Sequence, residues 1–489
     1  MTDYGFWSIL PPILAIVLAI RTRQVYISLG LGIWAGWIII NGGNFLSGSR
    51  DTIHAIVAVF SNEGSTQTVL FTLLIGSLMA FIQKSGGVSG FISMIEKKLK
   101  KKGHSKKRIQ YWAALTGLLI FVESNISALT VGTLYRPVTD RLKLSREKLA
   151  YLADSTSAPS SILVPLNAWG GFIMGLLLLQ GFDQPFITLA SAIPFNIYPI
   201  LAVMLVFFII STGRDYGPMR IAEMRADKQG KPLRDGATPV VSSDITLLEA
   251  KEGKPQRGIN MLLPVGIMVI AMPFMLITTG WTEANTGTSD SFINHSIQAI
   301  GNSSGAESVL YSVIISLLAS TILFRVQKIL SVREMASTAL KGMSGMVPMA
   351  LLMVLAFAIG NLCNELGTGE YVAEITRRWL SPSLAPLLIF LTSCFIAFST
   401  GTSWGTFAIM ISIAMPVAVS MEINISLALG AALGGGIFGD HCSPISDTTM
   451  ISSMASASDH IDHVRTQLPY ALTAGTLTAL AYLFLGYLL

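Results

Sequence analysis

Apolar segments recur along the whole chain, and their length is the feature that most limits what it can fold into. Each stretch of roughly 17–25 residues is long enough, as a helix, to cross the hydrocarbon core of a bilayer. Only 12% of the 489 residues are charged, whereas a soluble protein carries about one-quarter. So few charges cannot cover a water-facing surface. The sequence therefore predicts an all-α, polytopic integral membrane protein, because a helix satisfies its own backbone polar groups in lipid.

Composition also excludes several classes of protein. The first apolar stretch, residues 6–20, lacks a basic leader region and a small-residue cleavage site, so we expect a retained span rather than a signal peptide. Cys363, Cys394 and Cys442 lie inside apolar segments, which argues against a disulfide framework. The net charge of +5 does not indicate nucleic-acid binding, since excess Lys and Arg in a membrane protein mark cytoplasmic loops. No Walker-type phosphate loop is present, and no cofactor is expected.

Two basic stretches define the topology of the first half. Residues 96–108 and residues 136–148 are both rich in Lys and Arg, and such clusters belong in the cytoplasm. A single span between them would place the two stretches on opposite sides of the membrane. We therefore predict a re-entrant helical hairpin over residues 111–137, with Glu123, Ser124 and Asn125 at its tip.

The first half, residues 1–212, then has a regular order of elements. It contains spans near 6–20, 25–41 and 66–84, the hairpin 111–137, a broken helix over 147–180 interrupted at 158–161, and a span near 186–212. Residues 213–258 are charged and poor in apolar residues, which predicts a polar cytoplasmic linker between two halves.

The second half, residues 259–489, repeats this order in the opposite orientation. It contains spans near 259–280, 304–324 and 343–363, an amphipathic stretch over 365–380, a hairpin over 384–420 with its tip at 399–403, a broken helix over 424–458, and a final span near 468–488. Two inverted repeats with discontinuous helices are typical of secondary transporters. The expected fold has about ten spans plus two hairpins.

Short sequence matches support this duplication at corresponding places. Residues 121–125 align with residues 398–402 at the two hairpin tips, and residues 154–159 align with residues 440–444 in the two broken helices. Matches of this length also arise by chance. The repeat therefore depends on the order of elements more than on identities.

Residues 439–449 combine acidic, hydroxyl and proline residues directly after a glycine-rich apolar run. This places Asp440 and Asp447 at membrane depth, where a carboxylate costs about 2.5–3.5 kcal/mol on insertion scales. Pro444 frees a backbone carbonyl, and unwound backbone is tolerated there only in protein or beside a cavity. Carboxylate, hydroxyl and carbonyl oxygens are hard ligands that suit an alkali cation. The alternative is a helix kink whose polar groups are satisfied internally.

Other polar groups at comparable depth are weaker candidates. Asp154, Ser155 and Thr156 precede Pro159 with the same chemistry, although a juxtamembrane polar turn is an alternative. The tip of the first hairpin exposes helix-end amides and carbonyls that could hold an ion, or else it is a solvated kink within an ordinary span. Thr400, Thr402 and Ser403 carry less weight, because Ser and Thr hydroxyls often bond their own helix.

Histidines allow two interpretations. His441 is the only one of six placed in a deep apolar context, where it could relay protons or make a structural hydrogen bond. Residues 459–463 resemble a metal-binding cluster in composition, but their position after the membrane segment predicts a solvated cytoplasmic loop.

Residues 439–449, with residues 459–465 behind them, resemble the NhaC family of sodium/proton antiporters. The hairpin tip and the stretch beginning at Asp154 also fit this family, and the resemblance covers most of the chain outside the linker. It implies inverted repeats, each with a hairpin and a broken helix, and the exchange of cytoplasmic Na⁺ for external H⁺. Relatives also move carboxylates or amino acids.

The candidate binding residues come from both halves. They are Glu123, Ser124, Asn125, Asp154, Ser155, Thr156, Thr400, Thr402, Asp440, His441, Ser443, Ser446, Asp447 and Thr448. We expect Asp154, Asp440 and Asp447 to face one cavity and to hold Na⁺. A proton and a cation would compete for their oxygens, because a bound cation stabilises the ionised form and desolvation favours the protonated form.

The sequence thus predicts a multi-pass secondary transporter of the cytoplasmic membrane that exchanges Na⁺ for H⁺ by alternating access. Its partners would be Na⁺, H⁺ and the lipid bilayer, with a homodimer and a small organic solute left open. A Na⁺- or H⁺-coupled carrier of an amino acid or carboxylate is the main alternative. A channel would need a continuous pore without broken helices. An intramembrane enzyme would need a nucleophile–base set or a His-Glu-x-x-His motif, and neither is evident.

Overall fold

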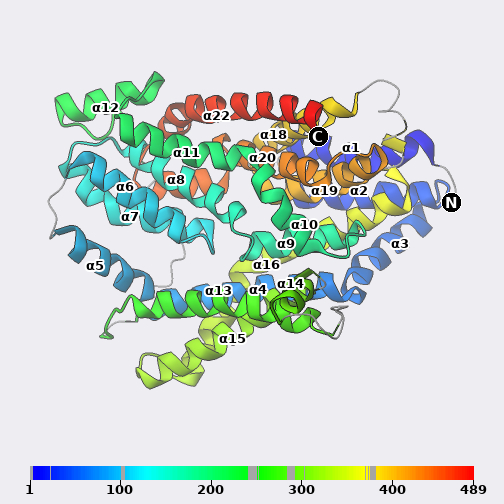
Figure 1. Cartoon of the computed structure of the whole chain (residues 1–489), viewed down its shortest axis with the longest axis horizontal. Helices are drawn as coiled ribbons and strands as arrows, with labels where there is room; N and C mark the ends of the chain where they lie inside the picture. Colours follow the sequence, from blue (N-terminus) through cyan, green and yellow to red (C-terminus); the bar gives the residue numbers. More distant parts are fainter. Residues whose placement is uncertain are drawn as a thin grey trace.

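The computed structural model describes residues 4–22, 24–100, 105–239, 250–251, 253–282, 292–301, 303–368, 371–372, 374 and 381–489. Within these ranges the chain is built from helices, without a strand (Figure 1). Nine of the described helices are long and apolar enough to cross a membrane, or ten if one bent pair is counted as a span. The predicted all-α, polytopic membrane fold is confirmed.

The N-terminal helices extend from one end of the molecule in Figure 1 to the other. They are α1 (Leu10–Thr22), α2 (Val25–Ile40), α3 (Phe45–Ala58), α4 (Glu63–Lys84) and α5 (Gly87–Lys100). The sequence did not predict α3, because Arg50 and Asp51 interrupt its apolar pattern. Asn44 begins this helix by accepting hydrogen bonds from the N–H groups of Leu46 and Ser47.

One layer of the molecule is formed by four long helices, along the lower side of Figure 1. These are α4 with α13 (Ile259–Gly280), α15 (Gly305–Val326) and α16 (Val332–Glu365), and the short α14 (Phe292–Gly301) packs on α13. Gly76 and Gly342 let α4 and α16 approach closely, since a Cβ atom on either glycine would overlap the carbonyl oxygen of the other. Small residues at such crossings are typical of membrane helices.

The first hairpin region consists of α6 (Lys106–Leu119) and α7 (Ser124–Arg141), followed by α8 (Arg146–Leu163) and α9 (Ala168–Leu179). The gap between α6 and α7 contains Glu123, as the sequence predicts for the tip. The axes of α8 and α9 differ by 42°, so the segment is a broken helix.

The position predicted for this break, residues 158–161, is wrong. Helix α8 continues through Pro159 and ends at Leu163. Pro165 follows the last turn of α8, and Asn167 begins α9 by accepting hydrogen bonds from the N–H groups of Trp169 and Gly170. A cap therefore decides where the break lies, whereas Pro159 is accommodated inside the helix.

The span predicted near 186–212 is divided. It consists of α10 (Pro185–Ala192), a 3₁₀ turn at Ile193–Phe195 and α11 (Ile197–Thr212). The linker after it contains α12 (Gly217–Gln229), which packs against α8 and α22. Most of the amphipathic stretch predicted over 365–380 lies outside the described residues.

The C-terminal helices repeat the arrangement of hairpin and broken helix. They are α18 (Ala385–Thr400), α19 (Ser403–Ser420), α20 (Ile425–Cys442), α21 (Asp447–Ala455) and α22 (His460–Leu488). Gly401 turns the chain between α18 and α19 with a left-handed φ of 69°. Both of these helices have spanning length, whereas α6 has 14 residues.

The two halves interlock. Helix α7 of the first hairpin packs against α21, the second part of the other half's broken helix. In return, α19 packs against α9, where the rings of Trp404 and Trp169 lie 5.3 Å apart between centroids. This reciprocal packing brings the breaks of both broken helices into the interior. The assignment of the two repeats to residues 1–212 and 259–489 stays a prediction.

Candidate functional site

Asp154 lies near the middle of α8, fully buried, and accepts hydrogen bonds from residues of the other half. The hydroxyl groups of Thr449 and Ser452 on α21 lie 3.2 and 3.3 Å from its carboxylate oxygens. The side-chain amide of Gln467 on α22 donates to the same carboxylate at 2.6 Å. Helix α8 of the first half thus places a carboxylate against the second broken helix.

Asp440 lies two residues before the end of α20, with 1% of its surface exposed. Ser403, the first residue of α19, donates to its Oδ2 at 2.9 Å. Ser446, the N-cap of α21, donates to its Oδ1 at 2.6 Å. The carboxylate therefore lies where the second hairpin and both parts of the broken helix meet.

Thr449 joins the two aspartates. Its Oγ1 lies 3.2 Å from Oδ2 of Asp154 and 3.2 Å from the backbone oxygen of Asp440. A hydroxyl has one hydrogen, so it cannot donate to both oxygens at the same time. Both contacts become hydrogen bonds when Asp154 is protonated and donates to Thr449, which then donates to the Asp440 carbonyl. The geometry thus accommodates a proton on Asp154.

Neither aspartate has a cationic partner. Among the residues that the structure describes, no Lys, Arg or His side chain forms an ion pair with Asp154 or Asp440. Their partners are hydroxyl groups and one amide, which carry no compensating charge. An isolated buried carboxylate is strongly unfavourable unless it is neutralised. This pair therefore needs a proton or a bound cation.

His441 follows Asp440 and is held from both sides of its ring. Its Nε2 lies 2.8 Å from the hydroxyl of Ser155 on α8, and its Nδ1 lies 2.7 Å from that of Tyr198 on α11. Its backbone oxygen accepts a hydrogen bond from Gln467. Both ring nitrogens thus have buried partners, which fits a positioning role as well as a relay.

The expectation of a solvated loop at residues 459–463 is wrong. His460 begins α22, and His463 is fully buried. The ring of His463 contacts Oε1 of Gln467 at 2.9 Å through Nε2 and the hydroxyl of Ser453 at 2.8 Å through Nδ1. Because α22 starts earlier than its hydrophobicity indicates, its polar first turns lie inside the protein.

Ser453 of α21 joins the two histidines at the start of α22. The Nε2 atom of His460 donates to the carbonyl oxygen of Pro444, 2.7 Å away, and its Nδ1 lies 3.0 Å from Oγ of Ser453. His463 reaches the same Oγ with its own Nδ1. The Ser453 hydroxyl also donates to the backbone oxygen of Thr449 at 2.8 Å, so one hydroxyl links both rings to the residue that contacts Asp154.

Comparison with known proteins identifies the family. Residues 177–487 match the sequence profile of the Na⁺/H⁺ antiporter family. The chain belongs to this family. This antiporter is therefore a carrier and not an enzyme, as predicted, and the assignment to a family of secondary transporters is confirmed.

Relatives of this antiporter extend the comparison. An uncharacterised protein of Haemophilus influenzae is 32% identical over 98% of this chain and 91% of its own length. The malate-2H⁺/Na⁺-lactate antiporter of Bacillus subtilis is 27% identical over 32% of this chain and 34% of its own. The solved structure of the Alcanivorax borkumensis YdaH transporter has a TM-score of 0.57 at 14% identity, covering 89% of this chain and 88% of its own, which shows a shared fold.

Within the described residues, no hydrogen bond joins the first hairpin tip of this antiporter to Asp154 or Asp440. Glu123 caps α7 by accepting from the N–H of Ile126 at 2.7 Å, and it lines an apolar cavity of about 130 Å³. Ser124 is buried. Oδ1 of Asn125 is buried without a hydrogen-bond partner, so this tip contains an unused acceptor.

Several other predicted residues satisfy the ends or turns of their own helices. Thr156 and Thr400 donate to backbone oxygens one turn earlier, and Thr402 caps α19. Ser443 donates to the carbonyl oxygen of Phe398 at 2.7 Å and fixes the second break against α18. These residues shape the site without direct contact with the two carboxylates.

Asp447 differs from the other two predicted carboxylates. It is exposed, and its Oδ1 accepts from the N–H of Thr448, whose hydroxyl lies 3.0 Å from Ser446. It interacts electrostatically with Asp440 and with Glu123. The described part of the chain has no group of three or more His, Cys, Asp or Glu side chains that could hold a metal ion. A shared Na⁺ site of Asp154, Asp440 and Asp447 stays a prediction.

The sequence indicates Ser403 only as a weaker candidate, yet its hydroxyl donates to Asp440. It did not single out three other residues that touch the aspartates, namely Thr449, Ser452 and Gln467. Thr449 lies within the segment 439–449, so proximity to this motif could have suggested it. Gln467 had a weaker indication: it is an uncharged polar residue directly before the apolar part of α22.

Proposed function

We propose that this antiporter exchanges Na⁺ for H⁺ at Asp154 and Asp440. The observation that carries the proposal is the burial of two carboxylates without a cationic partner, with Thr449 in contact with the carboxylate of Asp154 and with the backbone oxygen of Asp440. A proton and Na⁺ are the two occupants that can neutralise such a site. Membership of the Na⁺/H⁺ antiporter family supports the same pair of ions.

The proposed mechanism is competition for one set of oxygens. When Na⁺ is bound, the Asp440 carboxylate, the hydroxyls of Ser403 and Ser446 and the Thr449 hydroxyl supply hard oxygen ligands. When a proton is bound, Asp154 donates to Thr449. Either occupant removes the charge and allows the site to reorient, whereas two bare carboxylates resist movement through an apolar environment.

The histidine network is the proposed route of the proton. Gln467 contacts both Asp154 and His463, and Ser453 joins His463 to His460, which is only partly buried. The proposed location is the cytoplasmic membrane, with the linker facing the cytoplasm, as its basic residues favour.

Exchange in proteoliposomes tests this function. Purified protein is reconstituted with a pH-sensitive dye inside, and Na⁺ is added outside at fixed membrane potential. In wild type, Na⁺ should enter in exchange for luminal H⁺, so the pH of the lumen should rise. Asp154→Asn and Asp440→Asn should abolish this rise. Asp235→Asn, which removes an exposed carboxylate paired with Lys231, is the matched control and should retain full exchange.

A solute requirement would overturn the proposal. The Bacillus subtilis relative is a malate-2H⁺/Na⁺-lactate antiporter, so the same liposomes are tested with each carboxylate and with an amino-acid mixture. If Na⁺ produces no pH change until one of these solutes is present, the protein is a solute carrier. Retention of wild-type exchange in Asp440→Asn would remove the assignment of the site.

A further inference from the structure

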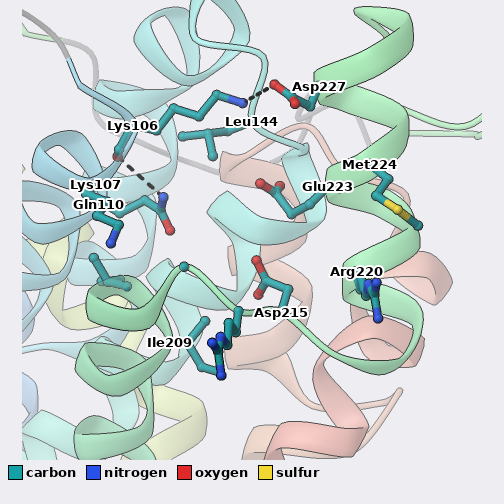
Figure 2. A pocket seen from close by; sticks show the side chains of 13 residues that line it. Lys106, Lys107, Gln110, Leu144, Ile209, Asp215, Arg220, Glu223, Met224 and Asp227 are labelled. Atoms are coloured by element: carbon teal, nitrogen blue, oxygen red, sulfur yellow. Dashed lines mark hydrogen bonds and ion pairs between the residues drawn. The ribbon is translucent and has the colours of Figure 1, made fainter.

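A second polar cavity lies outside the aspartate site, where the linker meets the helical bundle. It has a volume of about 770 Å³ and is bounded by α6, the end of α11 and α12. Figure 2 shows Lys106, Lys107 and Gln110 on one wall, Arg220, Glu223, Met224 and Asp227 on the α12 wall, and Asp215 between them. The proposed exchange does not use this cavity.

Internal ion pairs involve three of the seven charged residues that line the cavity. Lys106 pairs with Asp227 at 2.6 Å, and a dashed line marks this contact in Figure 2. Asp215 pairs with Lys148, a buried residue of α8, at 2.5 Å and also accepts from the hydroxyl of Tyr470. The opposite charges in each of these two pairs cancel, so neither pair offers a net charge to a ligand.

The remaining charges are mainly positive. The carboxylate of Glu223 accepts two hydrogen bonds from Ser145, one from its N–H at 2.8 Å and one from its hydroxyl at 2.7 Å. Lys107 donates to the carbonyl oxygen of Ser211 at the end of α11. Arg214 and Arg220 are exposed, and their guanidinium groups have no ion pair within the described residues. Two unpaired guanidinium groups at one cavity favour an anion with several oxygens, because their donors match phosphate geometry.

The surroundings identify the level of the cavity relative to the bilayer. Helix α11, whose end lines the cavity, is apolar. Its side chains Met204 and Phe208 are each 60% exposed, as expected of a surface that faces lipid. Ile209 and Ile210, at the end of this helix, line the cavity itself. On the α12 side, Ile221 is 66% exposed. The cavity thus lies where a membrane helix reaches the headgroup region, with apolar and cationic residues side by side.

We propose that this cavity binds the phosphate group of an anionic phospholipid, with Arg214 and Arg220 as its ligands. Basic pockets between membrane helices at the cytoplasmic face are suited to such headgroups. Lys107 lies at the edge of the site, and Ile209 and Ile210 contact the glycerol and the first acyl carbons. A free phosphate ion shares the charge but would not use these apolar contacts.

The site connects the lipid to the helix that holds Asp154. Asp215 follows Arg214 in the chain and pairs with Lys148 of α8. Lys106 belongs to α6, an arm of the first hairpin. A bound headgroup would therefore fix the start of the linker against the two elements that approach the aspartate site from the first half.

Binding is measured on the full chain after delipidation in detergent. Short-chain phosphatidylglycerol, short-chain phosphatidylcholine and inorganic phosphate are titrated separately, with thermal unfolding and native mass spectrometry as readouts. Phosphatidylglycerol should raise the Tm and appear as a bound adduct, and phosphatidylcholine should do neither. The double variant R214Q/R220Q should weaken phosphatidylglycerol binding by about tenfold or more, since two charge-assisted contacts are lost.

The control variant removes two positive charges elsewhere. R325Q/R333Q changes two exposed residues of α15 and α16, in the layer remote from α12 in Figure 1, and should bind phosphatidylglycerol like wild type. R214K/R220K should recover part of the affinity, because charge is retained without the guanidinium fork. Equal binding by wild type and R214Q/R220Q would overturn the site. Inorganic phosphate binding as tightly as phosphatidylglycerol would overturn the lipid assignment.

Discussion

The two broken helices are built on the same plan but end in different chemistry. In each, a proline follows the end of the first part, and a polar residue two positions later caps the second part: Pro165 with Asn167, and Pro444 with Ser446. Each break is also fixed to the preceding hairpin. Asn167 donates to the carbonyl oxygen of Phe121 at 2.9 Å, and Ser443 donates to that of Phe398 at 2.7 Å.

The difference lies four residues before each proline. The first break has Ser161 at this position, and the second has Asp440. At the first break the backbone oxygen of Ser161 is satisfied by a neutral amide, because the Asn167 side chain donates to it at 2.7 Å. The second holds a carboxylate bonded only by hydroxyl groups. One break is therefore a structural joint, and the other is built to take up a cation or a proton.

The largest expected effect comes from substituting the residue at this matched position in each half. Asp440→Asn should abolish Na⁺-driven proton movement in proteoliposomes, because the amide cannot hold a proton or neutralise Na⁺. Ser161→Ala should leave exchange close to wild type, since its hydroxyl has no hydrogen-bond partner. Equal losses in both variants would show that the two breaks are functionally equivalent and contradict the comparison.

The capping residues should separate stability from ion binding. Asn167→Ala removes a helix cap and two amide donations, which we expect to cost about 2–4 kcal/mol of stability. Ser446→Ala removes one cap, at about 1 kcal/mol, but also one of the two donors to Asp440. Thermal unfolding should therefore rank Asn167→Ala as the more damaging change, while the Na⁺ concentration for half-maximal exchange should rise more in Ser446→Ala. The reverse order in both measurements would contradict the assigned roles.

Thr449→Val tests the connection between the halves at similar volume. The valine removes the hydroxyl between Asp154 and the Asp440 carbonyl, and we expect a loss of about 1–2 kcal/mol in stability. Exchange should fall by about tenfold, the size expected for one lost hydrogen bond to a charged group. Ser412→Val, at a buried hydroxyl that bonds its own helix, is the control and should keep the wild-type rate. An unchanged Na⁺ dependence in Thr449→Val would remove this residue from the site.

The smallest effect concerns the start of α22, which carries Gln467. Burial acts to raise the pKa of Asp459, but hydrogen bonds from the N–H groups of Thr238, Asp462 and Ile461 outweigh it and hold this pKa below its ordinary value. A lowered folded-state pKa means that the carboxylate stabilises the fold above its unfolded pKa, and that this contribution disappears as pH falls through the folded value. Asp459→Ala should cost about 1 kcal/mol near neutral pH.

The pH dependence distinguishes a cap from a surface charge. The difference in Tm between wild type and Asp459→Ala should shrink as the pH is lowered below the ordinary pKa range of aspartate. Asp459→Asn keeps a capping oxygen and should be less destabilised at neutral pH, with less dependence on acid. A Tm difference that stays constant down to strongly acidic pH would exclude this account.

Local sequence properties located most helices and the second break. The length of the apolar segments predicts spans such as α13 and α15. The second break lies at residues 443–446, where Pro444 follows the end of α20 and Ser446 caps α21, as the sequence predicts. The first break was misplaced because Pro159 is the more conspicuous interruption, while Asn167 determines the break through bonds to Ser161 and Phe121. A cap with distant partners has no local pattern that distinguishes it from any other asparagine.

By itself, the sequence determined that this protein is helical and that it crosses a membrane, and it singled out Asp440 and Asp154 as candidate site residues, because hydrophobicity and charge act at the level of single segments. Only the tertiary structure decided which groups face these carboxylates. Gln467 reaches Asp154 across 313 residues of sequence, and Thr449 across 295. Such partners depend on how α8, α21 and α22 pack, and no spacing within one segment encodes that packing.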